Sequence, residues 1–251
     1  MRTKSLLEQL APWVVIVVVL VVWEFGTRAL GLQPFILPKP TDIYASLLRW
    51  WEQIQFHAVH TLTTTVTGFA IAVVLGITLG LLVGYSRLAY HALYPIMIGF
   101  NSVPKVALVP VLVIWFGIGT VPAVITACAI SFFPIVVNVA TGLATVEPEL
   151  EDVLRSLGAK RHDIFLKVGL PSAMPYFFAS LKVSVTLAFV GTIISETVAS
   201  NRGVGYLMIA ASGRFDVPLV FAGLFVIAVM GIVLYEGFAY MERKLTGWAY
   251  R

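Results

Sequence analysis

The sequence contains a single cysteine and few charged residues, and both scarcities narrow the class of protein. Cys128 has no second cysteine with which to form a disulfide inside the chain. Its place in an apolar run is typical of a small buried hydrophobic side chain. Asp, Glu, Lys and Arg make up 12% of the 251 residues, about half their share of a soluble globular domain. A water-soluble domain of this length is therefore not expected.

Sequence motifs for nucleotide hydrolysis and for hydrolytic enzymes are also absent. The chain has no G-x-x-x-x-G-K-[ST] phosphate-binding loop, no G-x-S-x-G nucleophile elbow and no H-E-x-x-H zinc motif. His57 and His60 have a spacing that suits a metal, but the sequence supplies no third ligand. We therefore expect no catalytic residue, no metal site and no cofactor held by this chain.

Long apolar runs fill most of the chain instead. Hydrophobic residues make up 59% of it, its mean hydropathy is +0.92, and about 20 apolar residues suffice for one helix to cross a bilayer. We predict an all-α polytopic membrane protein with one transmembrane domain over residues 1–251. Its six predicted spans are 12–30, 62–84, 93–116, 121–143, 177–199 and 218–240.

One predicted span carries a stripe of glycine. Four glycines recur at multiples of four residues along 62–84: Gly68, Gly76, Gly80 and Gly84. Small residues at this spacing let two helices approach closely in a membrane. We therefore expect this face to pack tightly against a neighbouring helix.

The predicted 93–116 span is interrupted by Pro104 and Pro110. Asn101 and Lys105 lie at the first interruption. Polar side chains and broken helices survive at membrane depth only against protein or a wet cavity. We expect either a wet cavity, in which the lysine could attract an anion, or a helix junction at the cytoplasmic surface.

The predicted 177–199 span contains Glu196, accompanied by Thr192 and Ser195. An ionisable side chain inside a span is a functional candidate by default; the alternative is that Glu196 lies near the outer interface and pairs locally. Lys182 precedes Glu196 by about 21 Å of helix, which is too far for an ion pair. We expect Lys182 to extend to the cytoplasmic surface.

The distribution of basic residues predicts the orientation. With six spans and the N-terminus inside, ten lysines and arginines fall in cytoplasmic segments and five in outer ones, leaving aside Lys105 and Lys182. Cytoplasmic loops carry the excess of positive charge in membrane proteins. Both termini are therefore predicted to be cytoplasmic.

Residues 144–176 form the most polar segment, between the fourth and fifth predicted spans. Pro148 suits the first turn of a helix, and Gly158 suits its end. The helix between them has one apolar stripe, formed by Leu150, Val153, Leu154 and Leu157. This stripe either fits a groove on a partner or packs on the neighbouring spans. A second short helix should follow and end at Leu170-Pro171.

This segment resembles the cytoplasmic loop of bacterial ABC importer permeases, which has the form E-A-A, three residues, Gly, nine residues, I-x-L-P. Asp152-Val153-Leu154 stands at the E-A-A positions, Gly158 follows after three residues, and Val168-Gly169-Leu170-Pro171 follows after nine more. The spacing, the glycine and the Leu-Pro pair agree. The two alanines are absent and Asp replaces Glu.

Further segments resemble the nitrate/sulfonate/taurine/bicarbonate-type permeases, a group that includes permeases for thiamine-pyrimidine and flavin precursors. These segments are Ile36-Leu37-Pro38-Lys39-Pro40-Thr41-Asp42-Ile43, Ala107-Leu108-Val109-Pro110 with Ile114-Trp115-Phe116-Gly117-Ile118-Gly119, and Gly203-Val204-Gly205-Tyr206. The resemblance covers roughly residues 12–245.

The resemblance implies a permease subunit of the type I ABC importer kind, with a cytoplasmic coupling helix between spans 4 and 5 and no enzymatic activity of its own. The implied partners are a second permease copy, two cytoplasmic ATPase subunits that bind ATP and Mg, and an extracytoplasmic binding protein, at the bacterial inner membrane and without nucleic acid. The residues implied to couple to the ATPase are Asp152, Val153, Leu154, Arg155, Ser156, Leu157, Gly158, Ala159, Leu170 and Pro171.

The translocation pathway is expected between the two copies. Its candidate residues are Asn101, Lys105, Thr192, Ser195 and Glu196. A sulfonate-, taurine- or nitrate-like anion is the first substrate expected, and a pyrimidine/thiamine or flavin precursor or an aromatic acid is the alternative. A secondary transporter driven by an ion gradient is a further alternative, although it would be expected to show paired intramembrane acids or internal repeats.

Overall fold

The computed structural model of the protein describes residues 6–85, 87–144 and 148–247. Within these ranges the regular structure is entirely helical, as predicted. The α-helices are α1 (Leu6–Ala29), α2 (Pro40–Arg49), α3 (Trp51–Tyr85), α4 (Arg87–Ser102), α5 (Val109–Phe116), α6 (Thr120–Ala144), α7 (Pro148–Ser156), α8 (Arg161–Ile164), α9 (Leu170–Ala199), α10 (Val204–Ser212) and α11 (Val217–Thr246). A short 3₁₀ helix (Lys105–Leu108) precedes α5, and a π-helical turn (Phe165–Gly169) joins α8 to α9.

Five stretches of the described helices are long and apolar enough to cross a membrane: Leu10–Ala29, Trp51–Gly84, Thr120–Leu143, His162–Ala199 and Val217–Thr246. A sixth span exists if α4 and the Lys105–Phe116 segment count as one, with a bend of 77° between them. The bend falls at Pro104, where the sequence predicts an interruption. Pro110 lies in the first turn of α5 and does not interrupt that helix, because backbone N–H groups in a first turn have no partner within the helix and proline lacks only that group.

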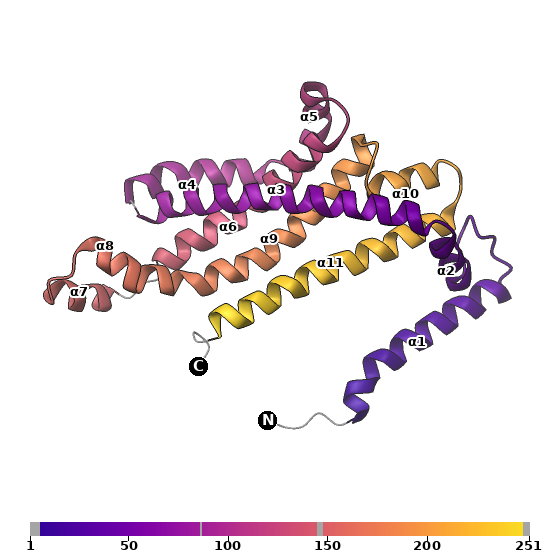
Figure 1. The fold of residues 1–251 in the computed structure, drawn as a ribbon, viewed down its shortest axis with the longest axis horizontal. Coiled ribbons are helices and arrows are strands. Elements are labelled where there is room, and N and C mark those ends of the chain that lie inside the picture. The colour runs from indigo at the N-terminus through magenta and orange to yellow at the C-terminus, as the bar shows by residue number, and fades with distance from the viewer. Residues whose placement is uncertain (1–5, 86, 145–147, 248–251) are drawn as a thin grey trace.

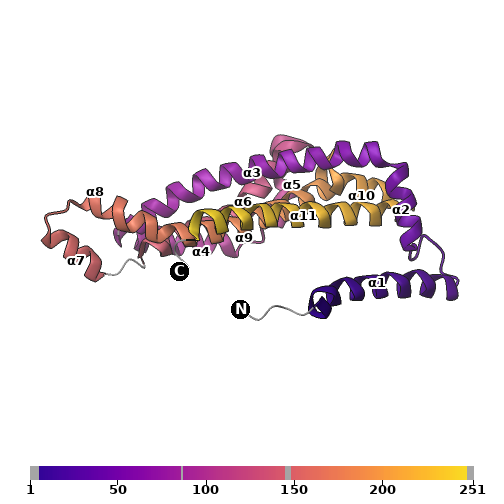
Figure 2. The same cartoon turned by 60° about the horizontal axis from the view of Figure 1, so that its bottom comes forward.

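The centre of the molecule is a bundle in which α3, α6, α9 and α11 run side by side (Figures 1 and 2). Helix α6 packs between α3 and α9, around buried residues that include Phe69, Ile135 and Val185. The predicted close packing of the glycine stripe is confirmed. A Cβ atom added at Gly76 or Gly80 would lie 2.7 Å from the side chain of Ile135 or Val139, both on α6.

One ion pair joins the two longest C-terminal helices. Lys182 Nζ of α9 lies 2.5 Å from Glu242 Oε2 of α11, and both side chains are largely covered. The sequence does not indicate this partner, because Glu242 follows the predicted 218–240 span. Helix α11 continues to Thr246 and thereby carries the glutamate to the lysine.

The predicted polar segment contains two helices that project beyond the end of the bundle, α7 and α8 (Figure 1). Residues 145–147 of the predicted 144–176 segment lie outside the described residues. The expectation that Leu170-Pro171 ends the second helix is wrong. The Leu170 amide donates to the Phe165 carbonyl in a π-helical turn, and α9 begins at Leu170. The wider turn accommodates Pro171, which has no N–H to donate, so the helix continues into the bundle.

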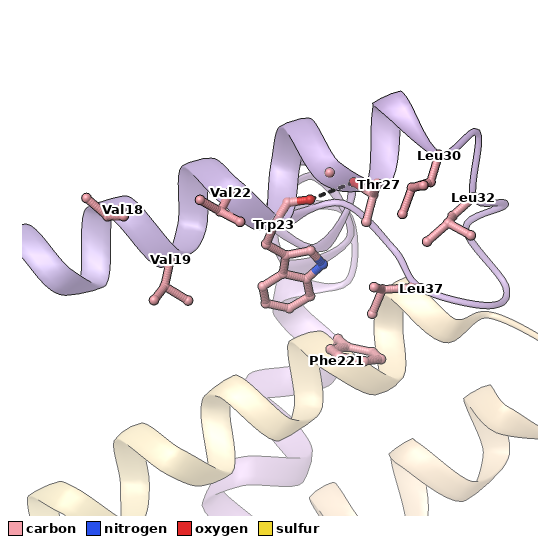
Figure 3. Close-up of a pocket in the computed structure, with 10 residues that line it drawn as sticks. Val18, Val19, Val22, Trp23, Thr27, Leu30, Leu32, Leu37 and Phe221 are labelled. Carbon is pink, nitrogen blue, oxygen red and sulfur yellow. Dashed lines mark hydrogen bonds between the residues drawn. The ribbon is translucent and has the colours of Figure 1, made fainter.

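Helix α1 lies apart from the bundle and joins it at the end away from α7 (Figures 1 and 2). The Trp23 ring points toward Phe221 of α11, as Figure 3 shows, with 5.8 Å between ring centroids. Glu24 accepts hydrogen bonds from the Thr41 amide and hydroxyl on α2. Every residue from Val14 to Val22 is exposed, so among the described side chains of α1 those that hold it to the rest of the chain lie near its C-terminal end.

Candidate functional site

Helix α7 ends in a hydrogen-bonded turn that depends on Gly158. The Gly158 amide donates to Arg155 O over 2.9 Å, and the Ala159 amide donates to Leu154 O over 3.0 Å. This pair of bonds is the Schellman arrangement, which needs a left-handed residue at its centre. Gly158 has φ +82°. The prediction that Gly158 stops the helix is therefore confirmed, and the stop gives α7 a defined length and direction.

The apolar stripe of α7 is open to the surroundings. The side chains of Val153 and Leu157 are 57% and 77% exposed, and Leu154 is half-buried. Asp152 and Arg155 form an exposed ion pair of 3.5 Å on α7. Among the described elements, α7 packs chiefly against α8. The bundle therefore leaves Val153 and Leu157 of this stripe uncovered, which favours the partner groove over the neighbouring spans.

The segment after α7 is anchored to the bundle. Ile164 at the end of α8 is buried. A Cβ atom at Gly142 of α6 would lie 2.8 Å from the Cα of Ala173 in α9, so the backbones of the two helices touch near Pro171. A displacement of α7 would reach the bundle through α8 and the start of α9.

The predicted pathway residues Asn101 and Lys105 lie together at the 77° bend. Lys105 Nζ donates to Asn101 Oδ1 over 2.7 Å and to the Asn101 carbonyl over 2.9 Å. The amine thus satisfies the carbonyl that the bend leaves without a helical partner. Asn101 is exposed and Lys105 is partly exposed.

The other three predicted pathway residues lie inside the helix packing. Thr192 and Ser195 are fully buried, and Glu196 is 2% exposed. The Thr192 hydroxyl accepts a hydrogen bond of 3.1 Å from Thr65 of α3, whereas the buried Ser195 hydroxyl has no partner among the described residues. A pathway role for these three side chains stays a prediction.

Glu196 belongs to a cluster that sequence reasoning missed. Both carboxylate oxygens accept from the Thr61 hydroxyl at 2.9 Å, and Oε2 also accepts from the Gly205 amide at 3.1 Å. The Val204 amide donates to Thr61 Oγ1 over 2.9 Å, and the Gly203 amide donates to His57 Nδ1 over 3.0 Å. The sign of this cluster in the sequence is the Gly203-Val204-Gly205-Tyr206 motif. The motif does not indicate which helix it contacts.

Comparison with known proteins shows the family to which this chain belongs. Residues 72–247 match the family model described as "Binding-protein-dependent transport system inner membrane component". The match extends over more than half of the chain, and the chain belongs to this family of ABC importer permeases. The family gives no support to the alternative of a transporter driven by an ion gradient.

Curated relatives match over most of the chain. The formylaminopyrimidine transport permease protein ThiX of Halalkalibacterium halodurans is 32% identical over 98% of both chains. The putative aliphatic sulfonates transport permease protein SsuC of Bacillus subtilis is 29% identical over 92% of this chain and 84% of that protein. These relatives are permease proteins, in agreement with the predicted nitrate/sulfonate/taurine-type resemblance.

A solved structure confirms the predicted fold type. An inward-facing structure of the MetNI methionine ABC transporter matches 78% of this chain and 97% of its own with a TM-score of 0.67. The sequences are 18% identical, so this likeness concerns the fold alone. The fold is that of a type I ABC importer permease.

Proposed function

We propose that this permease and a second copy of itself form the translocation pathway of an ATP-driven importer in the bacterial inner membrane. Both termini then lie in the cytoplasm, in agreement with the excess of basic residues on that side. ATP and Mg bind to two separate ATPase subunits, and an extracytoplasmic binding protein delivers the solute. A single chain with five or six spans supplies half of a symmetric pathway.

The exposed stripe of α7 is the observation that carries this proposal. Val153 and Leu157 are large apolar side chains that the bundle leaves uncovered. An amphipathic helix of this kind fits a hydrophobic groove on a partner protein. We assign that groove to the ATPase subunit. Closure of the ATPase dimer would push α7, and α8 with the start of α9 would carry the displacement into the bundle.

A pair of aspartate substitutions tests the assignment. L157D places a charge on the stripe, and S156D places the same charge on an exposed position beside it. Neither residue is buried, so both variants should fold. We expect L157D to lose co-purification with the ATPase encoded beside this permease, and S156D to retain it. Affinity purification from detergent extracts measures the bound ATPase.

Two results would contradict the proposal. If wild-type permease retains no ATPase, the importer assembly is wrong. If L157D retains the ATPase and its transport-coupled hydrolysis as well as S156D does, α7 is not the coupling helix.

Asn101 and Lys105 are our proposed pathway residues. The bend exposes them while their hydrogen bonds keep the lysine amine in place, and a fixed cation suits a passing anionic or polar solute. In this arrangement Thr192, Ser195 and Glu196 lie buried between the helices. There they support the helices that form the wall of the pathway.

The substrate belongs to one of two classes in this proposal. The relative named for formylaminopyrimidine matches the chain over nearly its full length, which supports a pyrimidine precursor as the first candidate. The relative named for aliphatic sulfonates and the cation of Lys105 support the sulfonate-like anion as the second. Uptake of each labelled solute into proteoliposomes with the complete assembly and its binding protein decides between them.

A further inference from the structure

Three consecutive backbone amides at the start of α10 each donate to a different side chain. Gly203 donates to His57, Val204 to Thr61 and Gly205 to Glu196, over 3.0, 2.9 and 3.1 Å. The first amides of a helix have no partner within the helix, and water normally satisfies them. Here, side chains of α3 and α9 replace that water. We call these three hydrogen bonds, from Gly203, Val204 and Gly205, the Gly203 cap.

Glu196 and Thr61 act as one unit in this cap. The Thr61 hydroxyl has one proton, which it donates to the Glu196 carboxylate, while its oxygen accepts the Val204 amide. Thr61 is fully buried and Glu196 almost so. Removal of the Thr61 side chain takes the acceptor from the Val204 amide and the donor from Glu196 Oε1, and removal of the Glu196 side chain takes the acceptor from the Gly205 amide. Either loss leaves buried groups without partners, which is more costly than the loss of an exposed hydrogen bond.

The space around the carboxylate fits this arrangement closely. A Cβ atom at Gly203 would overlap the Glu196 carboxylate, and one at Gly205 would lie 2.8 Å from the Glu196 Cβ. Within the described residues the carboxylate has no lysine or arginine partner. Its partners are a hydroxyl and an amide at the positive end of α10, where the helix dipole favours a negative charge.

We infer that Glu196 and Thr61 are positioning residues that hold the loop at 200–203 and α10 on the ends of α3 and α9. They act through hydrogen bonds and do not touch the solute. The outer segment therefore moves together with α3 and α9 during the transport cycle. This inference deepens the proposed function, because the segment lies at the end of the bundle opposite α7 (Figure 1).

Hydrogen exchange of the full chain, purified with its ATPase in detergent, tests the cap directly. In wild type we expect the amides of Gly203, Val204 and Gly205 to exchange at least about 100-fold more slowly than freely exposed amides, although they start a helix. T61V removes the hydroxyl and should accelerate exchange at Val204 and Gly205 about 10- to 100-fold. T61S keeps the hydroxyl and should match wild type.

Substitution of Glu196 separates positioning from a role of the charge itself. In E196Q the amide oxygen can accept from Gly205, and the amide nitrogen can donate to Thr61, whose own proton can turn to the His57 carbonyl 3.2 Å away. We expect E196Q to keep slow exchange and most of the transport rate. E196A removes the acceptor of the Gly205 amide and should accelerate exchange there as T61V does, with its ATPase still bound.

Three results would overturn the inference. The first is unprotected Gly203–Gly205 amides in wild type, a measurement that requires no variant to fold. The second is a T61V protein that exchanges as slowly as T61S. The third is an E196Q protein that keeps the slow exchange and loses transport as E196A does, since the charge itself would then be required. None of the exchange results depends on the substrate or on α7, so they stand apart from the L157D test.

Discussion

At the scale of single residues, two glycines with left-handed backbones differ in what surrounds them. Gly158 has φ +82° and open space where a Cβ would be. Gly203 has φ +101°, and a Cβ there would overlap the Glu196 carboxylate. At Gly158 only the backbone conformation disfavours a side chain. At Gly203 both the backbone conformation and the neighbouring carboxylate disfavour one.

We therefore predict that G203A destabilises the protein more than G158A. A positive φ costs an alanine about 1–2 kcal/mol at Gly158, and at least as much at Gly203, where ψ is 162° and the backbone lies in a region that is essentially restricted to glycine. Overpacking against the buried carboxylate adds about 1–3 kcal/mol at Gly203. Thermal unfolding of the two variants in the same detergent measures the difference. Equal melting temperatures would show that the carboxylate moves aside freely.

The sequence predicts the first of these glycines and not the second. Gly158 follows an apolar stripe of helical period, so a local pattern identifies it as a helix end. Gly203 is explained by Glu196, Thr61 and His57, and Thr61 and Glu196 are separated by 135 positions. A contact of that kind depends on how α3 and α9 pack, and no local pattern contains that information.

At the scale of elements, the α3–α6 contact depends on the glycine stripe. Gly68, Gly76 and Gly80 each leave room for an α6 side chain within 3 Å of where their Cβ would be. In lipid, such close contacts supply much of the attraction between helices, since the surrounding chains are as apolar as the helix faces.

G80A should accordingly destabilise the bundle, by about 1–3 kcal/mol, because Val139 and the α6 backbone leave no space for a methyl group. The matched control is G99A on α4, where nothing lies within 4 Å of the added atom. There, alanine should be neutral or stabilise the helix by up to about 1 kcal/mol. The fraction of monodisperse protein after heating reports both effects. A G80A protein as stable as G99A would contradict the packing argument.

Element boundaries show where reasoning from sequence succeeds and where it stops. The bend at Pro104 and the end of α7 follow from proline and glycine, which act on their own backbone. The continuation of α9 through Pro171 does not, because a π-helical turn upstream removes the clash that proline would otherwise cause. The Lys182–Glu242 pair likewise follows from how far α11 extends.

At the scale of the whole molecule, the orientation in the membrane follows from which end carries α7. If α7 meets an ATPase, it lies in the cytoplasm, and the Gly203 cap lies at the opposite surface. Cys128 is the only cysteine of the chain, so a C128A background gives a protein without thiols.

We predict that R202C in this background reacts with a membrane-impermeant maleimide on intact spheroplasts, whereas K160C reacts only after lysis. Both native side chains are exposed, so access to the reagent depends on the side of the membrane. Labelling in the reverse order would place α7 outside and would exclude its contact with an ATPase.

The loose attachment of α1 has a consequence for how the sequence can change over time. Residues Val14 to Val22 place few constraints on the rest of the fold, because their side chains are exposed and the described helices do not bury them. The family match begins at residue 72, after α1 has ended. As far as the chain's own fold is concerned, exchanges among valine, isoleucine and leucine along this face carry almost no penalty. Evolution is therefore free to alter the first helix while the core that it accompanies stays constrained.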